Sequence, residues 1–275
     1  MENNRHVSSR QQISIYLRRC ARIFKNEKGW KLYISTGLMT LLITLVAGSD
    51  FMVAKGATEK GAFAIVSACI WCGIFNSVRS VCRERDIVKR EYRTGLRLHA
   101  YITAHWLFEA RTCLVEAFIV SLLLWITNVG HYTEHGVLLP AFIEYFIACF
   151  LIIFSADALG ILISSAVPNE NAAMTVMPFA LLIQLLLCGV VFELKGIAEA
   201  LSYLTIGRWG QVALCTIADY NQLEIDAGGL MAYRVEKYTA TVSNLTTALC
   251  IMLIYAVLYA VLSVLVLRLV DRDSR

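Results

Sequence analysis

The feature that most constrains this chain is a series of long apolar stretches. An α-helix needs roughly 20 mostly apolar residues to cross the hydrocarbon core of a bilayer. Six stretches meet this need, at 32–54, 61–81, 105–127, 138–166, 173–192 and 246–268. Hydrophobic residues make up 58% of the 275 residues, whereas soluble domains hold about 45–50%. We therefore expect an all-α integral membrane protein with six transmembrane helices.

Lysine and arginine predict the orientation of these helices, because cytoplasmic loops carry an excess of both. Most of the 25 basic residues lie in three places: the N-terminal segment, the connection between the second and third stretches, and the C-terminal tail. An even number of spans puts all three on one side. Both termini are thus expected in the cytoplasm, with the chain crossing the plasma membrane several times.

The N-terminal stretch "QQISIYLRRCARIFKNEKGW" (11–30) is predicted to be a different kind of helix. Apolar residues recur at helical spacing and basic residues fill much of the remainder, which is typical of an amphipathic helix lying in the membrane interface. The apolar positions are Ile13, Leu17, Cys20 and Phe24. The simpler alternative is a positive-inside anchor for the first span.

The chain divides into a cytosolic N-terminal segment, 1–31, and a six-span domain, 32–275. Between the last two spans lies a region, about 193–245, that is too apolar for an ordinary exterior loop. Glycines interrupt it, so we expect short helices that re-enter the outer leaflet where other parts of the protein cover their backbone. Two further full spans are the alternative, but Arg208 argues against them.

A dense run of charge, "RERDIVKREYRTGLR" (83–97), follows the second span. Acidic and basic residues alternate there, and Ile87 and Leu96 supply apolar contacts. Such a segment can form a short helix parallel to the membrane that offers charge to a cytosolic surface. A solvated positive-inside loop is the alternative that charge alone leaves open.

The motif "ERDIVKRE" (84–91) resembles the paired glutamate–arginine and arginine–glutamate pattern of G-subfamily ABC exporters, where it leads into the coupling helix. The segment 159–214 is similar to that family's fourth span, tight turn, fifth span and outer helices. Two positions depart from the pattern, because Arg97 and Arg111 stand where the family tends to have tyrosine and proline. The resemblance implies these residues for coupling to an ATPase: Glu84, Arg85, Arg90 and Glu91.

The resemblance also implies partners. The chain contains no G-x-x-x-x-G-K-[ST] phosphate loop, so it is not expected to be an enzyme by itself or to bind a cofactor. A cytosolic ABC ATPase, separate or joined in a longer chain, would bind ATP and magnesium. A second membrane subunit, identical or related, would complete a dimer; no nucleic-acid partner is expected. Arg85 and Arg90 would pair with acids of the ATPase, and Glu91 would brace the start of the third span.

The resemblance places the translocation path along the second and fifth spans of two subunits. For each of these positions, tight helix packing is the alternative. A mostly apolar path would suit an amphipathic or lipidic cargo. The positions that correspond to the path and its outer apolar plug are Phe75, Asn76, Met177, Gln184, Gly189, Val190 and Val191.

Three carboxylates, Glu116, Glu144 and Asp157, fall within the predicted spans, where such groups are costly and usually have partners. A proton-coupled secondary carrier would use them, with Asp157 deepest, and this is the alternative function. Their structural role would be hydrogen bonding to neighbouring helices. His131 and His135 are four residues apart, a spacing that could bind a metal on a helix, but they fall in a short outer loop, so no metal is expected.

Overall fold

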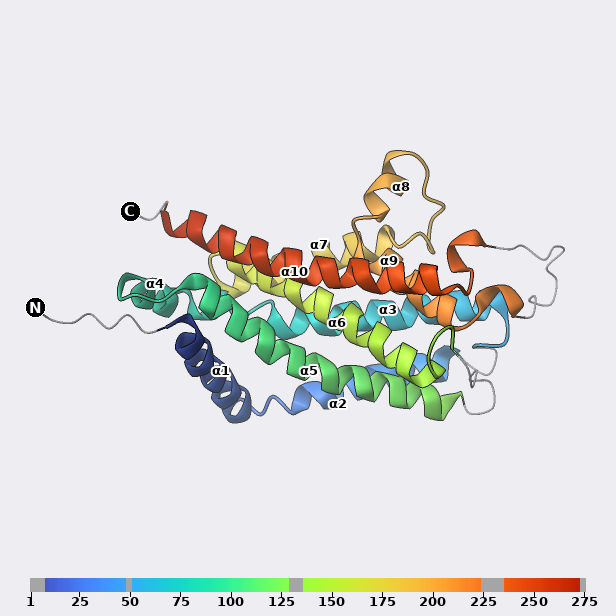
Figure 1. Ribbon diagram of the computed structural model, residues 1–275, viewed down its shortest axis with the longest axis horizontal. Coiled ribbons are helices and arrows are strands. Elements are labelled where there is room, and N and C mark those ends of the chain that lie inside the picture. Colours follow the sequence, from blue (N-terminus) through green and yellow to red (C-terminus); the bar gives the residue numbers. More distant parts are fainter. Residues whose placement is uncertain (1–7, 48–50, 129–135, 224–234, 273–275) are drawn as a thin grey trace, which may run out of the picture.

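The computed structural model describes residues 8–47, 51–128, 136–223 and 235–272 (Figure 1). Within these ranges the chain is helical and holds no strand, which confirms the all-α prediction. The elements are α1 (Ser9–Asn26), α2 (Lys31–Ala47), α3 (Lys55–Ser77), η1 (Cys82–Glu84), α4 (Arg85–Arg93), α5 (Leu98–Thr127), α6 (Ala141–Ala166), α7 (Glu170–Leu186), α8 (Ile197–Ser202), α9 (Ile206–Ile217), η2 (Tyr220–Gln222), η3 (Glu236–Tyr238) and α10 (Val242–Arg272).

Three helical segments of the described chain are long and apolar enough to cross a membrane: Lys55–Arg93, Ala141–Ala166 and Val242–Leu269. A fourth is added if α1 and α2, which meet at a 69° bend, are taken as one broken span. The apolar helix α7 has 17 residues and is shorter. The count of six spans, which α2, α5 and α7 would complete, stays a prediction.

The helix α1 is turned away from α2, as a helix lying in the interface would be (Figure 1). Its start is fixed by a capping box, in which the Ser8 hydroxyl accepts from the Gln11 amide and the Gln11 side chain accepts from the Ser8 amide. At its end Lys28 has a φ of 55°, a left-handed conformation that stops the helix. The predicted amphipathic helix is therefore present, bounded by local chemistry.

The long helices run side by side along the molecule, with α6 packed against α3, α5, α9 and α10 (Figure 1). The α4 helix, α1 and the end of α10 lie at one end of this bundle, and α8 projects from its side. Glycines allow a close contact between α3 and α6. A Cβ atom on Gly73 would clash with the Ile153 carbonyl, and one on Gly160 with the Ile74 carbonyl. These glycines let the two backbones approach closely, as small residues do in membrane helix pairs.

Short helices α8 and α9 occupy part of the region predicted to re-enter the outer leaflet. The residues of α9 are almost all buried, and the helix packs on α3, α6 and α10. Residues 224–234 of the predicted region lie outside the described residues. The short helices are thus present before the last span, while their depth in a bilayer stays a prediction.

Candidate functional site

The charged segment between α3 and α5 forms a compact unit that we call the coupling element, residues 82–97. It begins where α3 gives way to η1, and this break leaves backbone amides without helical partners. The Ser164 hydroxyl of α6 accepts from two of them, Val81 N and Cys82 N, each at 3.0 Å. The coupling element is therefore attached at its start to the central helix of the bundle.

The turn that ends the coupling element is held from α1. Gly95 has a φ of 110°, a conformation that favours glycine. The Gln12 amide donates to the Gly95 carbonyl at 3.1 Å and accepts from the Arg97 amide at 3.0 Å. One buried side chain of α1 thus fixes both sides of the turn into α5.

A cluster of charged and aromatic side chains joins α1 and α5 to η1 and α4 of the coupling element. Arg19 lies 3.1 Å from one Glu84 oxygen and 3.6 Å from Glu91. The Tyr101 hydroxyl donates to the other Glu84 oxygen at 3.2 Å. We call this group the Arg19 cluster: Tyr16, Arg19, Glu84, Glu91 and Tyr101.

The Tyr16 hydroxyl donates to the Glu91 carboxylate within this cluster. Burial and this hydrogen bond raise the pKa of Tyr16, so the phenol remains a donor through the physiological range. Glu91 therefore contacts α1, and its expected role as a brace for the start of α5 stays a prediction. One cation shared by two carboxylates makes the cluster an interdependent unit.

Arg85 is buried and points into the bundle, where its guanidinium donates to the Val167 carbonyl. Val167 is the residue that ends α6, and its carbonyl has no helical partner there. This contact is structural, so Arg85 is not on the surface in the described conformation. The expected pairing of Arg85 with an acid of the ATPase stays a prediction.

The outer face of α4 carries charge at helical spacing. Asp86, Arg90 and Arg93 are all exposed and lie four and three residues apart, on one side of the helix. Of the four predicted coupling residues, Arg90 is the one that is exposed; Glu84, Arg85 and Glu91 face the bundle. The coupling element thus has an anchored inner face and a charged outer face.

Sequence reasoning did not predict the residues that receive this inner face, namely Gln12, Tyr16, Arg19 and Ser164. They lie 65 or more positions from their partners, and no local period links them. Arg19 and Tyr16 do lie in a predicted amphipathic helix, which could have suggested contacts with the coupling element. A position in the membrane interface explains a basic and an aromatic residue there equally well.

The predicted translocation residues lie on α3, on α7 and in the turn after α7. Asn76 donates to Glu116 at 2.7 Å, and Phe75 packs against Arg79, whose guanidinium lies 5.6 Å from the ring. Met177 is buried. Gln184 is also buried, and its carbonyl oxygen accepts from the Ile206 and Gly207 amides at the start of α9. Gln184 therefore secures α9 to α7 in the described conformation.

Gly189, Val190 and Val191, the predicted plug, follow the end of α7. Gly189 has a φ of 80° and Val191 is exposed. Gly189 lines a cavity of about 370 Å³ that is bordered by the turn after α7, by α9 and by the start of α3. The predicted plug thus adjoins an open space, but its role as a plug stays a prediction.

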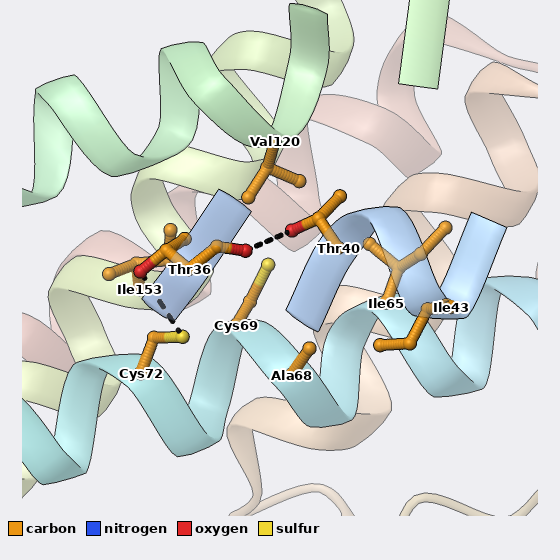
Figure 2. A pocket seen from close by; sticks show the side chains of 9 residues that line it. All are labelled: Thr36, Thr40, Ile43, Ile65, Ala68, Cys69, Cys72, Val120 and Ile153. Carbon is orange, nitrogen blue, oxygen red and sulfur yellow. Dashed lines mark hydrogen bonds between the residues drawn. The ribbon is translucent and has the colours of Figure 1, made fainter. Parts of the chain in front are cut away.

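The middle of the bundle offers no comparable space at the contact of α2 with α3. A crevice there has a volume of about 10 Å³. Its lining residues include Thr36, Thr40, Cys69 and Cys72 (Figure 2). A single water needs about 10–15 Å³. A cargo therefore cannot pass between these helices in the described conformation.

The three intramembrane carboxylates have different surroundings. Glu144 accepts from the amides of residues 137–139 at 2.6–2.9 Å, which is a structural cap on the loop before α6. Glu116 accepts from Thr36 and Asn76, each at 2.7 Å. Asp157 is fully buried, and neither of its carboxylate oxygens has a hydrogen-bond partner within the described chain. Across the same ranges no cluster of His, Cys, Asp and Glu could hold a metal ion.

These features define a helical membrane domain whose charged coupling element is anchored on one face and exposed on the other. The chain belongs to the ABC-2 type transporter family, whose model matches residues 11–217. It is therefore a permease component of an ABC transporter, as the "ERDIVKRE" motif predicted.

The chain is also similar to a longer protein, the ABC transporter ATP-binding/permease protein Rv1747 of Mycobacterium tuberculosis (strain ATCC 25618 / H37Rv). The two are 22% identical over 229 residues, which is 79% of this chain. The match covers 26% of the relative, so the chain spans about a quarter of that protein's length.

Proposed function

We propose that this permease forms half of the membrane portion of an ATP-driven exporter. A cytosolic ABC ATPase would bind the outer face of α4, and closure of that ATPase would tilt the membrane helices in an alternating-access cycle. Both termini and the coupling element would face the cytoplasm of the cell whose plasma membrane holds the protein.

One observation carries the proposal: the coupling element is fixed to three helices by its inner face, while the outer face of its helix α4 is exposed and charged. The inner contacts reach α1 through Arg19, α5 through Tyr101, and α6 through Ser164 and Val167. A force applied at Arg90 would therefore reach the whole bundle. The location of α1, α4 and the end of α10 at one end supports the proposed orientation (Figure 1).

The dimer rests on the exposed apolar side of α7. Phe179 is 66% exposed and Leu182 is 54% exposed. A second copy facing this helix would enclose a path between α3 and α7 of the two subunits, lined from Asn76 toward Gly189. The two copies would be related by a two-fold axis, the commonest symmetry of oligomers.

The coupling role is tested by reversing one exposed charge. Arg90→Glu should abolish ATP hydrolysis by the complex that purifies with the tagged chain, because the partner's acidic contact becomes a repulsion. The unfolding midpoint should not change, since an exposed substitution away from special contacts alters stability by only about 0.5 kcal/mol. Hydrolysis is measured as phosphate release in nanodiscs.

Arg18→Glu is the matched control, because Arg18 is exposed on α1 at the same end of the bundle and undergoes the same charge change. It should leave hydrolysis intact. Full hydrolysis in Arg90→Glu, or transport by the chain with no ATPase present, would contradict the proposal.

A proton-coupled secondary carrier is the second candidate, and the burial of Asp157 without a hydrogen-bond partner favours it. Carboxylates inside membranes often mark proton routes. This candidate predicts transport into vesicles that follows a proton gradient in the absence of ATP and is lost in Asp157→Asn. The ATP-driven proposal predicts that dissipating the gradient has no effect.

A further inference from the structure

A cavity of about 170 Å³ lies between α1, α3 and α5, beside the Arg19 cluster. It is lined on its apolar side by Ile23, Phe24 and Phe108, and on its polar side by Asn76 and Glu109. Exposed residues at its edge, among them Arg79, open it to solvent. A space of this size holds several waters but is smaller than the roughly 300–1,000 Å³ of a drug-sized site. It suits the head group of a larger molecule.

Most charges around the cavity are already paired. Arg83 forms an ion pair with Glu27 across the edge, and Glu84 is paired with Arg19. Two charged side chains remain. Arg79 is exposed and lies against the Phe75 ring, so water and the ring satisfy it.

Glu109 is the second, and it differs because it is 8% exposed. Its carboxylate accepts from the Thr112 hydroxyl at 2.8 Å, and within the described ranges it forms no ion pair with lysine or arginine. A buried carboxylate without an opposite charge is unfavourable. A cation entering the cavity would supply that charge.

The aromatic wall indicates which cation. Phe24 and Phe108 pack edge to face with ring centroids 5.6 Å apart, and both line the cavity. The faces of aromatic rings attract organic ammonium groups through cation–π interactions, and the rings also contact the alkyl substituents of such groups. The described residues offer no cluster that could hold a metal ion. An organic ammonium group therefore fits the lining better than a metal ion.

We propose that this cavity is a binding site for the ammonium head group of an amphipathic amine, with Glu109 as the counter-charge and Phe24 and Phe108 as the apolar wall. Asn76 supplies a polar group beside them. The apolar body of such a molecule would extend out of the cavity along α1. This site belongs to the single chain and does not require the ATPase or the second subunit.

The test uses the full chain in nanodiscs of phosphatidylglycerol, a lipid without an amine, with empty nanodiscs subtracted. Choline is the probe, its uncharged isostere 3,3-dimethylbutan-1-ol is the neutral control, and isethionate is an anion of similar size. Saturation-transfer NMR titrations measure affinity. We expect saturable binding of choline, at least ten-fold weaker binding of the neutral isostere, and at least a ten-fold loss of choline affinity in Glu109→Gln.

Glu193→Gln, in an exposed carboxylate near the other cavity, should leave choline binding unchanged. Ile23→Trp fills the cavity from a partly exposed position and should abolish choline binding. If Glu109→Gln does not fold, this variant provides the test of the proposed site. Unfolding midpoints verify each variant. The proposal would be overturned if choline and its isostere bound equally, or if choline affinity were unchanged in folded Glu109→Gln or Ile23→Trp. It would also be overturned if isethionate bound and this binding were lost in Arg79→Gln.

Discussion

The coupling element and α7 differ in how they are held. The coupling element is attached by charged and polar side chains from three helices, and its Arg19 cluster is largely buried. Helix α7 meets its neighbours mainly through apolar contacts, with a large apolar side exposed. Directional polar contacts fix one geometry, whereas an apolar face can exchange lipid for protein at little cost. The comparison indicates that the coupling element is held rigidly, whereas α7 can adapt to what covers its exposed side.

Reversing the charge of Arg19 should produce the largest loss. Arg19→Glu would place a third carboxylate beside Glu84 and Glu91. The wild-type side chains of Arg19 and Glu84 are only 24% and 11% exposed, so water would screen the repulsion poorly. Removing one partner of a buried pair costs about 3–5 kcal/mol, and the partial exposure favours the lower figure. We expect the free energy of unfolding to fall by about 3 kcal/mol, measured by denaturant titration in mixed micelles.

The swapped double variant Arg19→Glu/Glu84→Arg provides the control, since it restores an opposite pair at the same place. It should recover at least half of the lost stability. If Arg19→Glu were as stable as wild type, the Arg19 cluster would not be what holds the coupling element. The coupling element would then not differ from α7 in the way described.

The Glu27–Arg83 ion pair should contribute much less, because both side chains are about half exposed. The hydrogen bond from Arg83 lowers the pKa of Glu27 below its ordinary value of 4.5. Its stabilisation is therefore present above pH 4.5 and is lost as the pH falls through the folded-state pKa. An exposed pair contributes at most about 1 kcal/mol.

The measurement compares wild type with Glu27→Gln in unfolding experiments from pH 7 to pH 3. The stability difference should be below about 1 kcal/mol at pH 7 and should vanish at the acid end. If the stability difference between wild type and Glu27→Gln grew as the pH fell, it could not come from the Glu27–Arg83 ion pair.

Substitution of Phe179 on α7 should affect the stability of a single copy least, by about 0.5 kcal/mol or less, because the side chain is exposed. In a Cys250→Ser background, which removes an exposed native cysteine, Phe179→Cys should form an oxidative cross-link between two copies. Leu258→Cys on the exposed side of α10 should not. Cross-linking at α10 alone would move the proposed dimer interface away from α7.

The sequence predicted those elements whose signals are local. The amphipathic period of 11–30 predicted α1, and the alternating charge of 83–97 predicted a short helix that the structure places at Arg85–Arg93. The fifth span was predicted at 173–192, but α7 is Glu170–Leu186. Asn169 caps it earlier, and the left-handed backbone at Gly189 follows its end, whereas apolar residues continue to Phe192 and conceal the boundary.

The contacts that define the site depend on residues far apart in the chain. Glu84 and Glu91 were selected as coupling residues, yet the cation that binds both is Arg19 of α1. Gln184 was selected for the path, and in the structure its side chain binds the start of α9. Pairings across 22 to 82 residues leave no period in a single sequence, so the residues could be identified but their partners could not.

The hydrogen bond from Arg85 to the Val167 carbonyl connects α4, the proposed docking helix for the ATPase, to the turn that leads into α7. Val167 lies three residues before Glu170, the first residue of α7, so the two are separated by one short turn. Displacement of α4 would pull on that turn directly, with no need to bend the α3–α6 pair that glycines hold in close contact. On the proposed function, we expect the Arg85 guanidinium to transmit movement of α4 to α7, and its removal to leave α4 folded but no longer linked to α7.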